Sequence, residues 1–229
     1  MTETSFRDDR IARAVAEAAK GAPFDGWTGE GFDKAVAAAG IAPGEARVLF
    51  PHGGRDLAAA YHRDADARLT EAMAEADLTG MRYSQKVAHA IWLRLQLVAS
   101  DREAVRKATA LFSLPQNAAE GAKLIWGTAD TIWNALGDTS DDANWYSKRA
   151  ILSGVYGSTV LYWLGDQSAD QTETRAYIDR RIDDVMAFER FKARFRDTPF
   201  GKAFARGPGQ LMSRIRKPAD RRGDLPGAL

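Results

Sequence analysis

Few residues in this chain of 229 could support catalysis. There is no cysteine, which excludes thiolate nucleophiles, disulfides and cysteine-ligated metals. The three histidines, His52, His62 and His89, follow leucine, alanine and lysine by three positions, so none completes the Glu-x-x-His pair of di-iron bundles. No phosphate-binding Gly-x-x-x-x-Gly-Lys-Ser loop or Gly-x-Ser-x-Gly motif occurs. We therefore predict a protein that is not an enzyme, with no catalytic residue, metal site or cofactor.

A segment near residue 145 instead combines aromatic and basic side chains. Tryptophan, tyrosine and arginine often dominate protein interfaces, and on a helix Trp145 has Lys148 and Arg149 as neighbours at three and four positions. The pattern fits a docking surface. It also fits aromatic side chains buried in a bundle, with the two basic residues as a solvated rim. The candidate partner-binding residues are Asp141, Asn144, Trp145, Tyr146, Lys148 and Arg149.

The net charge of +1 conceals an asymmetry along the chain. From Glu189 to Arg222 there are eleven Lys or Arg against three Asp or Glu, which leaves 21 basic and 28 acidic residues elsewhere. The basic arm therefore predicts an anionic partner, either phospholipid or nucleic acid. Its apolar residues recur one helical turn apart among the basic ones, as in a helix lying on a membrane surface. The alternative is that the arm packs over the rest of the chain. The candidate membrane-binding residues are Phe200, Lys202, Phe204, Arg206, Leu211, Met212, Arg214 and Ile215.

The elements that must position these residues are helices. Alanine, leucine and arginine recur at three- and four-residue spacings, and alternating strand patterns are missing. Three short helices are expected in about the first fifty residues: one over 8–20 that Gly21 ends, one from Thr28 as N-cap to Gly40, and one opened by Pro43. Longer helices are predicted over residues 56–76, 84–100, 101–111, 116–136, 142–165 and 172–195, and a further amphipathic one over 197–217.

The stretch from Gly26 to His62 resembles the N-terminal three-helix unit of TetR-type transcriptional regulators in the order of its turn, short helix and following long helix. The expected recognition helix offers Glu45 and Arg47, and one acid beside one base is poorly suited to neutralising phosphate. We expect a degenerate helix-turn-helix that keeps the shape and has lost the reading surface. No nucleic acid partner is expected.

The most specific stretch is Asp130–Arg149, which reads DTIWNALGDTSDDANWYSKR. It resembles the signature of the ninth COQ family, the lipid-binding accessory proteins of ubiquinone biosynthesis. With Gly26–Thr28 and Leu49–Pro51 included, the resemblance extends over most of the chain. The agreeing positions are Asp130, Trp133, Gly137, Asp138, Asn144, Trp145, Tyr146, Lys148, Arg149, Val155, Tyr156, Asp166, Asp179, Arg180, Arg181 and Ile182.

The resemblance implies an all-α, TetR-like bundle that forms a homodimer and holds an isoprenoid lipid or phospholipid in an apolar cavity. It also implies that the chain presents a quinone intermediate to a di-iron demethoxyubiquinone hydroxylase, docked at the Trp145 segment. Aromatic residues on the long helices could line such a cavity, although ordinary core packing explains them as well. The candidate lipid-binding residues are Trp92, Trp133 and Tyr156.

We expect four parts: a helix-turn-helix-like unit over 1–55, a lipid-binding bundle over 56–196, a membrane-binding arm over 197–217 and a flexible tail over 218–229. The first residues show no targeting signal, and the most apolar window, residues 90–99, is interrupted by Arg94 and is too short to span a bilayer. These features predict a bacterial cytoplasmic protein that is peripheral on the inner membrane. The alternative functions are a TetR-like, ligand-responsive DNA-binding regulator and a purely structural dimeric scaffold.

Overall fold

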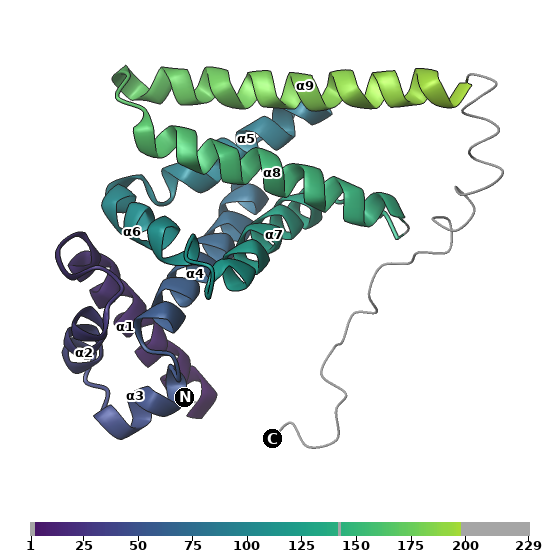
Figure 1. The fold of residues 1–229 in the computed structure, drawn as a ribbon. Helices are drawn as coiled ribbons and strands as arrows, with labels where there is room; N and C mark the ends of the chain where they lie inside the picture. The colour runs from purple at the N-terminus through teal and green to yellow at the C-terminus, as the bar shows by residue number, and fades with distance from the viewer. Residues whose placement is uncertain (1–2, 142, 198–229) are drawn as a thin grey trace.

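The computed structural model describes residues 3–141 and 143–197, and every regular element in these ranges is a helix (Figure 1). Two 3₁₀ turns, η1 (Ala99–Asp101) and η2 (Ala169–Gln171), precede α6 and α9. The helices are α1 (Glu3–Asp25), α2 (Gly29–Ala38), α3 (Pro43–Leu49), α4 (Gly54–Glu75), α5 (Tyr83–Gln96), α6 (Arg102–Phe112), α7 (Ala118–Ala135), α8 (Ala143–Gly165) and α9 (Thr172–Asp197).

The first three helices gather at one end of the molecule, and α4 leads away from them (Figure 1). Helix α1 packs against α2, α4 and α6, which joins this end to the rest. Helix α4 packs against α5 and α7, and α8 lies on α7. Helix α9 covers both α5 and α8 (Figure 1). The result is a bundle in which α4, α5, α6, α7 and α8 surround a common interior.

Local sequence explains the turns around α2 and α4. The Thr28 hydroxyl caps α2 by accepting a hydrogen bond from the Gly31 amide at 3.2 Å. Helix α4 begins so close to the chain before α2 that a Cβ on Gly54 would lie 2.4 Å from the Trp27 carbonyl oxygen, so only glycine fits there. The Trp27 indole Nε1 donates to the Ala104 carbonyl at 3.0 Å. This bond ties the N-terminal helices to α6.

The prediction that Gly21 ends the first helix is wrong. Helix α1 continues through Gly21 and Pro23 to Asp25. The side chains of Ala18 and Ala22 are buried against neighbouring helices, and this packing outweighs the weak helix propensity of glycine and proline. The helices predicted from residue 56 onward agree with α4 to α9, with ends shifted by a few residues.

The core runs through α4, α5, α7, α8 and α9, where Leu57, Leu69, Ile91, Ile132 and Trp163 are fully buried. Among the residues that the structure describes, no helix has both the length and the apolar character needed to cross a membrane. The predicted tail over 218–229 and all the predicted membrane-binding residues lie outside the described residues, and those assignments stay predictions. These residues are Phe200, Lys202, Phe204, Arg206, Leu211, Met212, Arg214 and Ile215.

Candidate functional site

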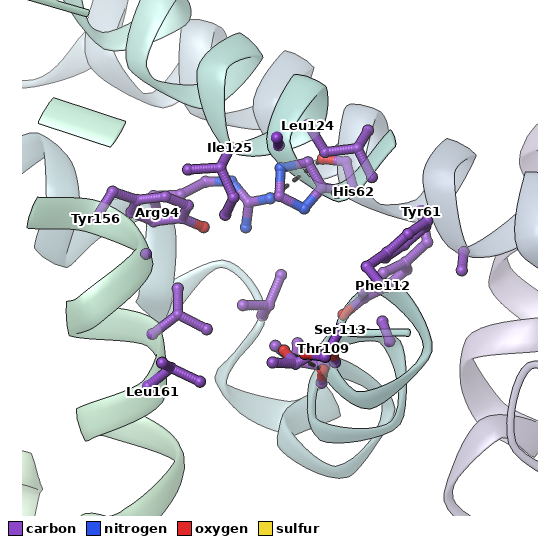
Figure 2. A pocket seen from close by; sticks show the side chains of 18 of the residues that line it. Tyr61, His62, Arg94, Thr109, Phe112, Ser113, Leu124, Ile125, Tyr156 and Leu161 are labelled. Atoms are coloured by element: carbon purple, nitrogen blue, oxygen red, sulfur yellow. Dashed lines mark hydrogen bonds between the residues drawn. The ribbon is translucent and has the colours of Figure 1, made fainter. Parts of the chain in front are cut away.

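A cavity of about 270 Å³ lies between α4, α5, α6, α7 and α8, and we call it the ligand cavity (Figure 2). In Figure 2, Arg94, His62 and Tyr156 gather at one end, and Thr109, Ser113 and Leu161 lie across the open space. A mostly apolar hollow with a few convergent polar groups is the usual form of a small-molecule site. Its apolar lining includes Ala58, Leu95, Val105, Phe112, Ile125 and Val160.

Arg94, which lines the cavity, forms a buried ion pair with Asp66. Arg94, which is 2% exposed, donates from Nε to Asp66 Oδ1 at 2.8 Å and from Nη2 to the His62 carbonyl oxygen at 3.1 Å. The Thr128 hydroxyl lies 2.9 Å from the same carboxylate oxygen. Because both charges are buried, removing either partner alone would leave the other without compensation.

The other polar groups at this end are neutral. Burial, together with the positive charge of Arg94, lowers the pKa of His62 to about 3. The imidazole is therefore uncharged near neutral pH, with Nε2 2.8 Å from the Thr128 hydroxyl. Burial raises the pKa of Tyr156, so its phenol keeps its proton near neutral pH. The polar end thus carries one positive and one negative charge, which balance.

Sequence reasoning missed most of this polar end, which we define as Asp66, His62, Arg94, Thr128 and Tyr156. A signal was present in the interruption of the apolar window 90–99 by Arg94, because an arginine amid core residues of a helix needs a buried partner. His62 and Asp66 are four residues apart in α4, so both reach the same face of that helix. The sequence does not indicate that this face of α4 packs against Arg94 of α5.

The helices that carry the three predicted lipid-binding residues, α5, α7 and α8, all contribute to the wall of the ligand cavity, but the three side chains do not line one hollow. Tyr156 lines the ligand cavity. Trp133 lines a separate groove of about 230 Å³, together with Tyr83 and Ile151, between α5, α7, α8 and α9. Trp92 lines neither hollow, because the Arg175 guanidinium of α9 covers its ring at 4.1 Å from the centroid.

The predicted partner-binding residues divide into buried and accessible ones. Arg149 is 1% exposed, and its guanidinium binds Asp130 Oδ1 at 2.5 Å, Asp138 Oδ2 at 3.1 Å and Asn134 Oδ1 at 3.2 Å. We call these four residues the Arg149 cluster. The same guanidinium lies 4.1 Å from the centre of the Trp145 ring. Arg149 therefore joins α8 to α7 and supports Trp145 from beneath.

Lys148 is half-buried beside this cluster. Its Nζ binds Asp138 Oδ1 at 2.6 Å and the Ser140 hydroxyl at 2.8 Å. Burial alone would raise the pKa of Asp138, but the hydrogen bonds from Lys148, Ser140 and Arg149 outweigh it and lower that pKa to about 2. Asp138 is therefore ionised across the physiological range.

An aromatic surface patch remains above the Arg149 cluster, made of Trp126, Trp145 and Tyr146, and we call it the Trp145 patch. All three side chains are partly exposed. The Trp145 ring lies 5.9 Å from that of Trp126 and 4.8 Å from that of Tyr146. Asp141 and Asn144 are exposed nearby. The accessible part of the predicted docking site is therefore mainly aromatic and polar, and Lys148 is partly exposed beside it.

Two further observations concern alternative functions. In the described part of the chain, no group of His, Asp or Glu side chains is arranged to hold a metal ion. In α3, which occupies the position of a recognition helix, the Glu45 carboxylate accepts a hydrogen bond from Arg10 at 2.6 Å. Val48 of the same helix is 74% exposed.

Comparison with known proteins agrees with both resemblances. Residues 118–189 match the COQ9 family model, a range that holds α7, the Arg149 cluster and α8. The chain is 29% identical to the rat mitochondrial ubiquinone biosynthesis protein COQ9 over 76% of its own length and 58% of the relative's. It is 32% identical to Xenopus laevis COQ9-A over 76% of its own length and 52% of that protein. The chain therefore spans a little over half the length of the curated relatives it matches.

A solved structure has the same fold. A TetR transcriptional regulator from Nitrosomonas europaea aligns with a TM-score of 0.60 and 19% identity, over 76% of this chain and 95% of the regulator. The predicted all-α, TetR-like fold is confirmed, and so is the resemblance to the ninth COQ family.

Proposed function

We propose that this chain is a non-catalytic, lipid-binding accessory protein of ubiquinone biosynthesis, which presents an isoprenoid quinone intermediate to a di-iron hydroxylase at a membrane surface. The observation that carries the proposal is the ligand cavity, a mostly apolar hollow inside a bundle that resembles proteins named for ubiquinone biosynthesis. A pathway role for the relatives and a hollow suited to an apolar molecule point to the same function.

Two glycines of α8 provide a matched test. Gly157 lines the ligand cavity, and a Cβ there would lie 3.9 Å from Ile125, so a leucine side chain at this position would enter the hollow. Gly154, one turn away, is exposed and has no atom near its Cβ position. Both substitutions improve helix propensity, by up to about 1 kcal/mol, so neither should weaken the helix itself.

We expect the purified chain to carry lipid that organic solvent extracts and mass spectrometry identifies. Gly157→Leu should reduce the amount at least about tenfold, because the side chain competes for the cavity. Gly154→Leu should leave the amount unchanged. Equal lipid content in both variants would refute lipid carriage in this cavity.

The Trp145 patch supports the proposed docking of the hydroxylase. Partly exposed aromatic residues held by a rigid base are typical of interface hot spots, and the Arg149 cluster provides that base. Trp145→Ala should weaken binding to a ferritin-like di-iron hydroxylase at least about tenfold. Tyr162→Ala, an aromatic truncation elsewhere on α8, serves as the control. Unchanged binding by Trp145→Ala would favour the purely structural scaffold.

Membrane association rests on the sequence of the basic arm. We propose that Phe200 and Phe204 insert at the surface while Lys202 and Arg206 approach anionic head groups, each basic residue contributing on the order of 1 kcal/mol. Phe200→Ser with Phe204→Ser should reduce sedimentation with vesicles that contain phosphatidylglycerol. Unchanged sedimentation with the vesicles would show that the basic arm does not bind the membrane through Phe200 and Phe204.

The regulator alternative makes the opposite prediction for DNA. A helix that exposes Val48 and pairs Glu45 with Arg10 offers little positive charge to phosphate, so we propose that no nucleic acid is bound. Tight duplex binding that weakens steeply with added salt would favour the regulator.

We propose a homodimer on the resemblance alone, and sedimentation equilibrium tests it.

A further inference from the structure

The groove lined by Trp133 is a second apolar hollow, and part of its wall faces solvent. It lies between α5, α7, α8 and α9, and we call it the α9 groove. Tyr83 and Met186, which line it, are 50% and 41% exposed, and the lining residues Ile151 and Val185 are half-buried. Exposed apolar surface that is gathered in one place marks a site that another group covers.

A buried donor indicates what kind of group covers the α9 groove. The indole Nε1 of Trp133 is buried and has no hydrogen-bond partner among the described residues. A buried donor without an acceptor is destabilising, so we expect the occupant of the groove to bring an acceptor. A hydrocarbon tail has none, whereas a peptide brings carbonyl oxygens together with apolar side chains. The groove therefore favours a peptide segment over a lipid tail.

The charges around the α9 groove favour a basic segment. Lys148, the charged residue in its described lining, has its Nζ 2.6 Å from Asp138 Oδ1, so its positive charge is compensated. On α9, Asp183 is exposed next to the lining residue Ile182. The range Glu189–Arg222 holds eleven basic and three acidic residues, against 21 basic and 28 acidic residues elsewhere in the chain. The basic arm therefore has the charge that complements the rest of the molecule.

The chain after α9 can return to the α9 groove. Helix α9 packs against α5 and α8 and ends at Asp197 (Figure 1). Pro199 follows two residues later, and proline disfavours a helical conformation of the residue before it, so we expect a turn at this point. A helix that returns beside α9 from this turn advances at the same rate, about 1.5 Å per residue, in the opposite direction.

Such a return brings the second half of the arm level with the groove. Leu211 and Met212 lie 13 and 14 positions after residue 198, and Val185 lies 13 positions before it. A break in the helix at residues 207–209 would lengthen the return by a few ångström and move Leu211 toward Ile182. Ile182 and Val185 both line the groove. In either case an apolar pair of the arm lies opposite the apolar wall.

We infer that the α9 groove binds the basic arm of its own chain, with Leu211 and Met212 entering it, and that the arm leaves the groove to bind an anionic membrane. The docking stands on the groove, whereas the exchange rests on the proposed membrane association. Leu211 and Met212 are among the predicted membrane-binding residues, so the groove and the membrane compete for one apolar surface. Docking lowers the membrane affinity according to the fraction of chains whose arm is docked.

A photocrosslinker in the groove wall tests the docking. Replacing Tyr83 by p-benzoylphenylalanine in the full-length chain keeps an aromatic ring against Trp133 and places the reactive group in the groove. Irradiation without membranes should join it to the tryptic peptide 207–214, which holds Leu211 and Met212, within a single chain. The same replacement at Phe24, which is 87% exposed and lies outside the groove, is the control and should give no such product.

Vesicles of two compositions test the exchange. Phosphatidylglycerol vesicles should reduce the crosslink from position 83 at least about tenfold, because the anionic surface takes up the arm. Phosphatidylcholine vesicles, which have no net charge, should leave it unchanged.

A matched pair of arginine variants measures the competition from the other side. Ile151→Arg puts a positive charge in the groove wall and repels the arm, so its affinity for phosphatidylglycerol vesicles should exceed that of Ala150→Arg at least about fivefold. Ala150→Arg adds the same charge at the neighbouring position, which is exposed and outside the groove. Equal affinities would overturn the competition.

The crosslinks distinguish this inference from the proposed function. A position 83 crosslinker that does not reach residues 207–214, or reaches them only in a second chain, would overturn docking of the chain's own arm. A crosslink that persists while the chain sediments with phosphatidylglycerol vesicles would overturn the exchange. An intact crosslink in a chain that binds no vesicles would support the docking and contradict the proposed membrane association. Should Ile151→Arg not fold, the crosslinks decide.

Discussion

Arg94 and Arg149 are both almost completely buried, and their surroundings differ in one decisive respect. Arg149 is bound by Asp130, Asp138 and Asn134 and lies under the Trp145 ring. Arg94 has a single carboxylate partner, and part of its guanidinium faces the hollow of the ligand cavity. The nitrogens of the Arg149 guanidinium all bind protein groups, whereas Arg94 uses only Nε and Nη2 for bonds to described residues.

The difference separates a structural role for Arg149 from the binding role that we propose for Arg94. A buried arginine bound on several sides fixes the elements that supply its partners, here α7 and α8. A buried arginine whose charge is balanced but whose donors are not all used is suited to a neutral acceptor. Burial alone would have assigned both residues the same role.

The largest expected effect is on the Arg149 cluster. Arg149→Met should lower the free energy of unfolding by about 3–5 kcal/mol, because Asp138 is buried and would lose a charged partner. Lys148→Met, at a half-exposed neighbour of the same carboxylate, should cost only about 0–1 kcal/mol. Urea denaturation measures both. Similar losses for the two variants would contradict the structural role of Arg149.

A smaller effect is expected when the other pair is removed as a unit. Arg94→Met alone should be costly, since Asp66 would remain buried without its partner. Combining Arg94→Met with Asp66→Asn should reduce the loss to about 1–2 kcal/mol, mainly for the bond to the His62 carbonyl. Urea denaturation of the single and double variants measures both losses. A double variant as unstable as Arg94→Met would show that the charges of Arg94 and Asp66 do not compensate each other.

The polar end should also give the stability of the chain a pH dependence. His62 has a pKa of about 3 in the folded chain, below its usual value, so unfolding takes up a proton between these two pH values. Stability should therefore be greatest above about pH 6.5 and decline as the pH falls toward 3. In His62→Gln, the free energy of unfolding measured by urea denaturation should fall less steeply across this pH range. Identical slopes for the two proteins would mean that His62 is not held neutral.

Much of the fold follows from the sequence because helical periodicity persists along most of the chain. The exception is α1, where the burial of Ala18 and Ala22 carries the helix past Gly21. Helix α1 packs against α2, α4 and α6, and no local pattern reveals these contacts. Glycine and proline predict helix ends well only where the surrounding side chains are not needed by the core.

The candidate site is less predictable for the same reason. Basic residues beside tryptophan are typical of interfaces, yet Arg149 is buried because Asp130 and Asp138 converge on it from α7 and the following loop. Likewise, the sequence marks Arg94 as unusual but does not identify Asp66 as its partner on another helix. Tyr156 was identified as a lining residue, whereas Trp92 and Trp133 face other neighbours.

The most direct test of the central claim is the position of the ligand itself. Decylbenzoquinone carrying a photoactivatable diazirine beside the ring can be crosslinked to the full-length chain and the modified peptides mapped by mass spectrometry. We predict modification within α5 and α8, near Arg94 and Tyr156, that Gly157→Leu abolishes and Gly154→Leu does not. Crosslinks confined to the separate groove lined by Tyr83, Trp133 and Ile151 would contradict the assignment of the ligand cavity.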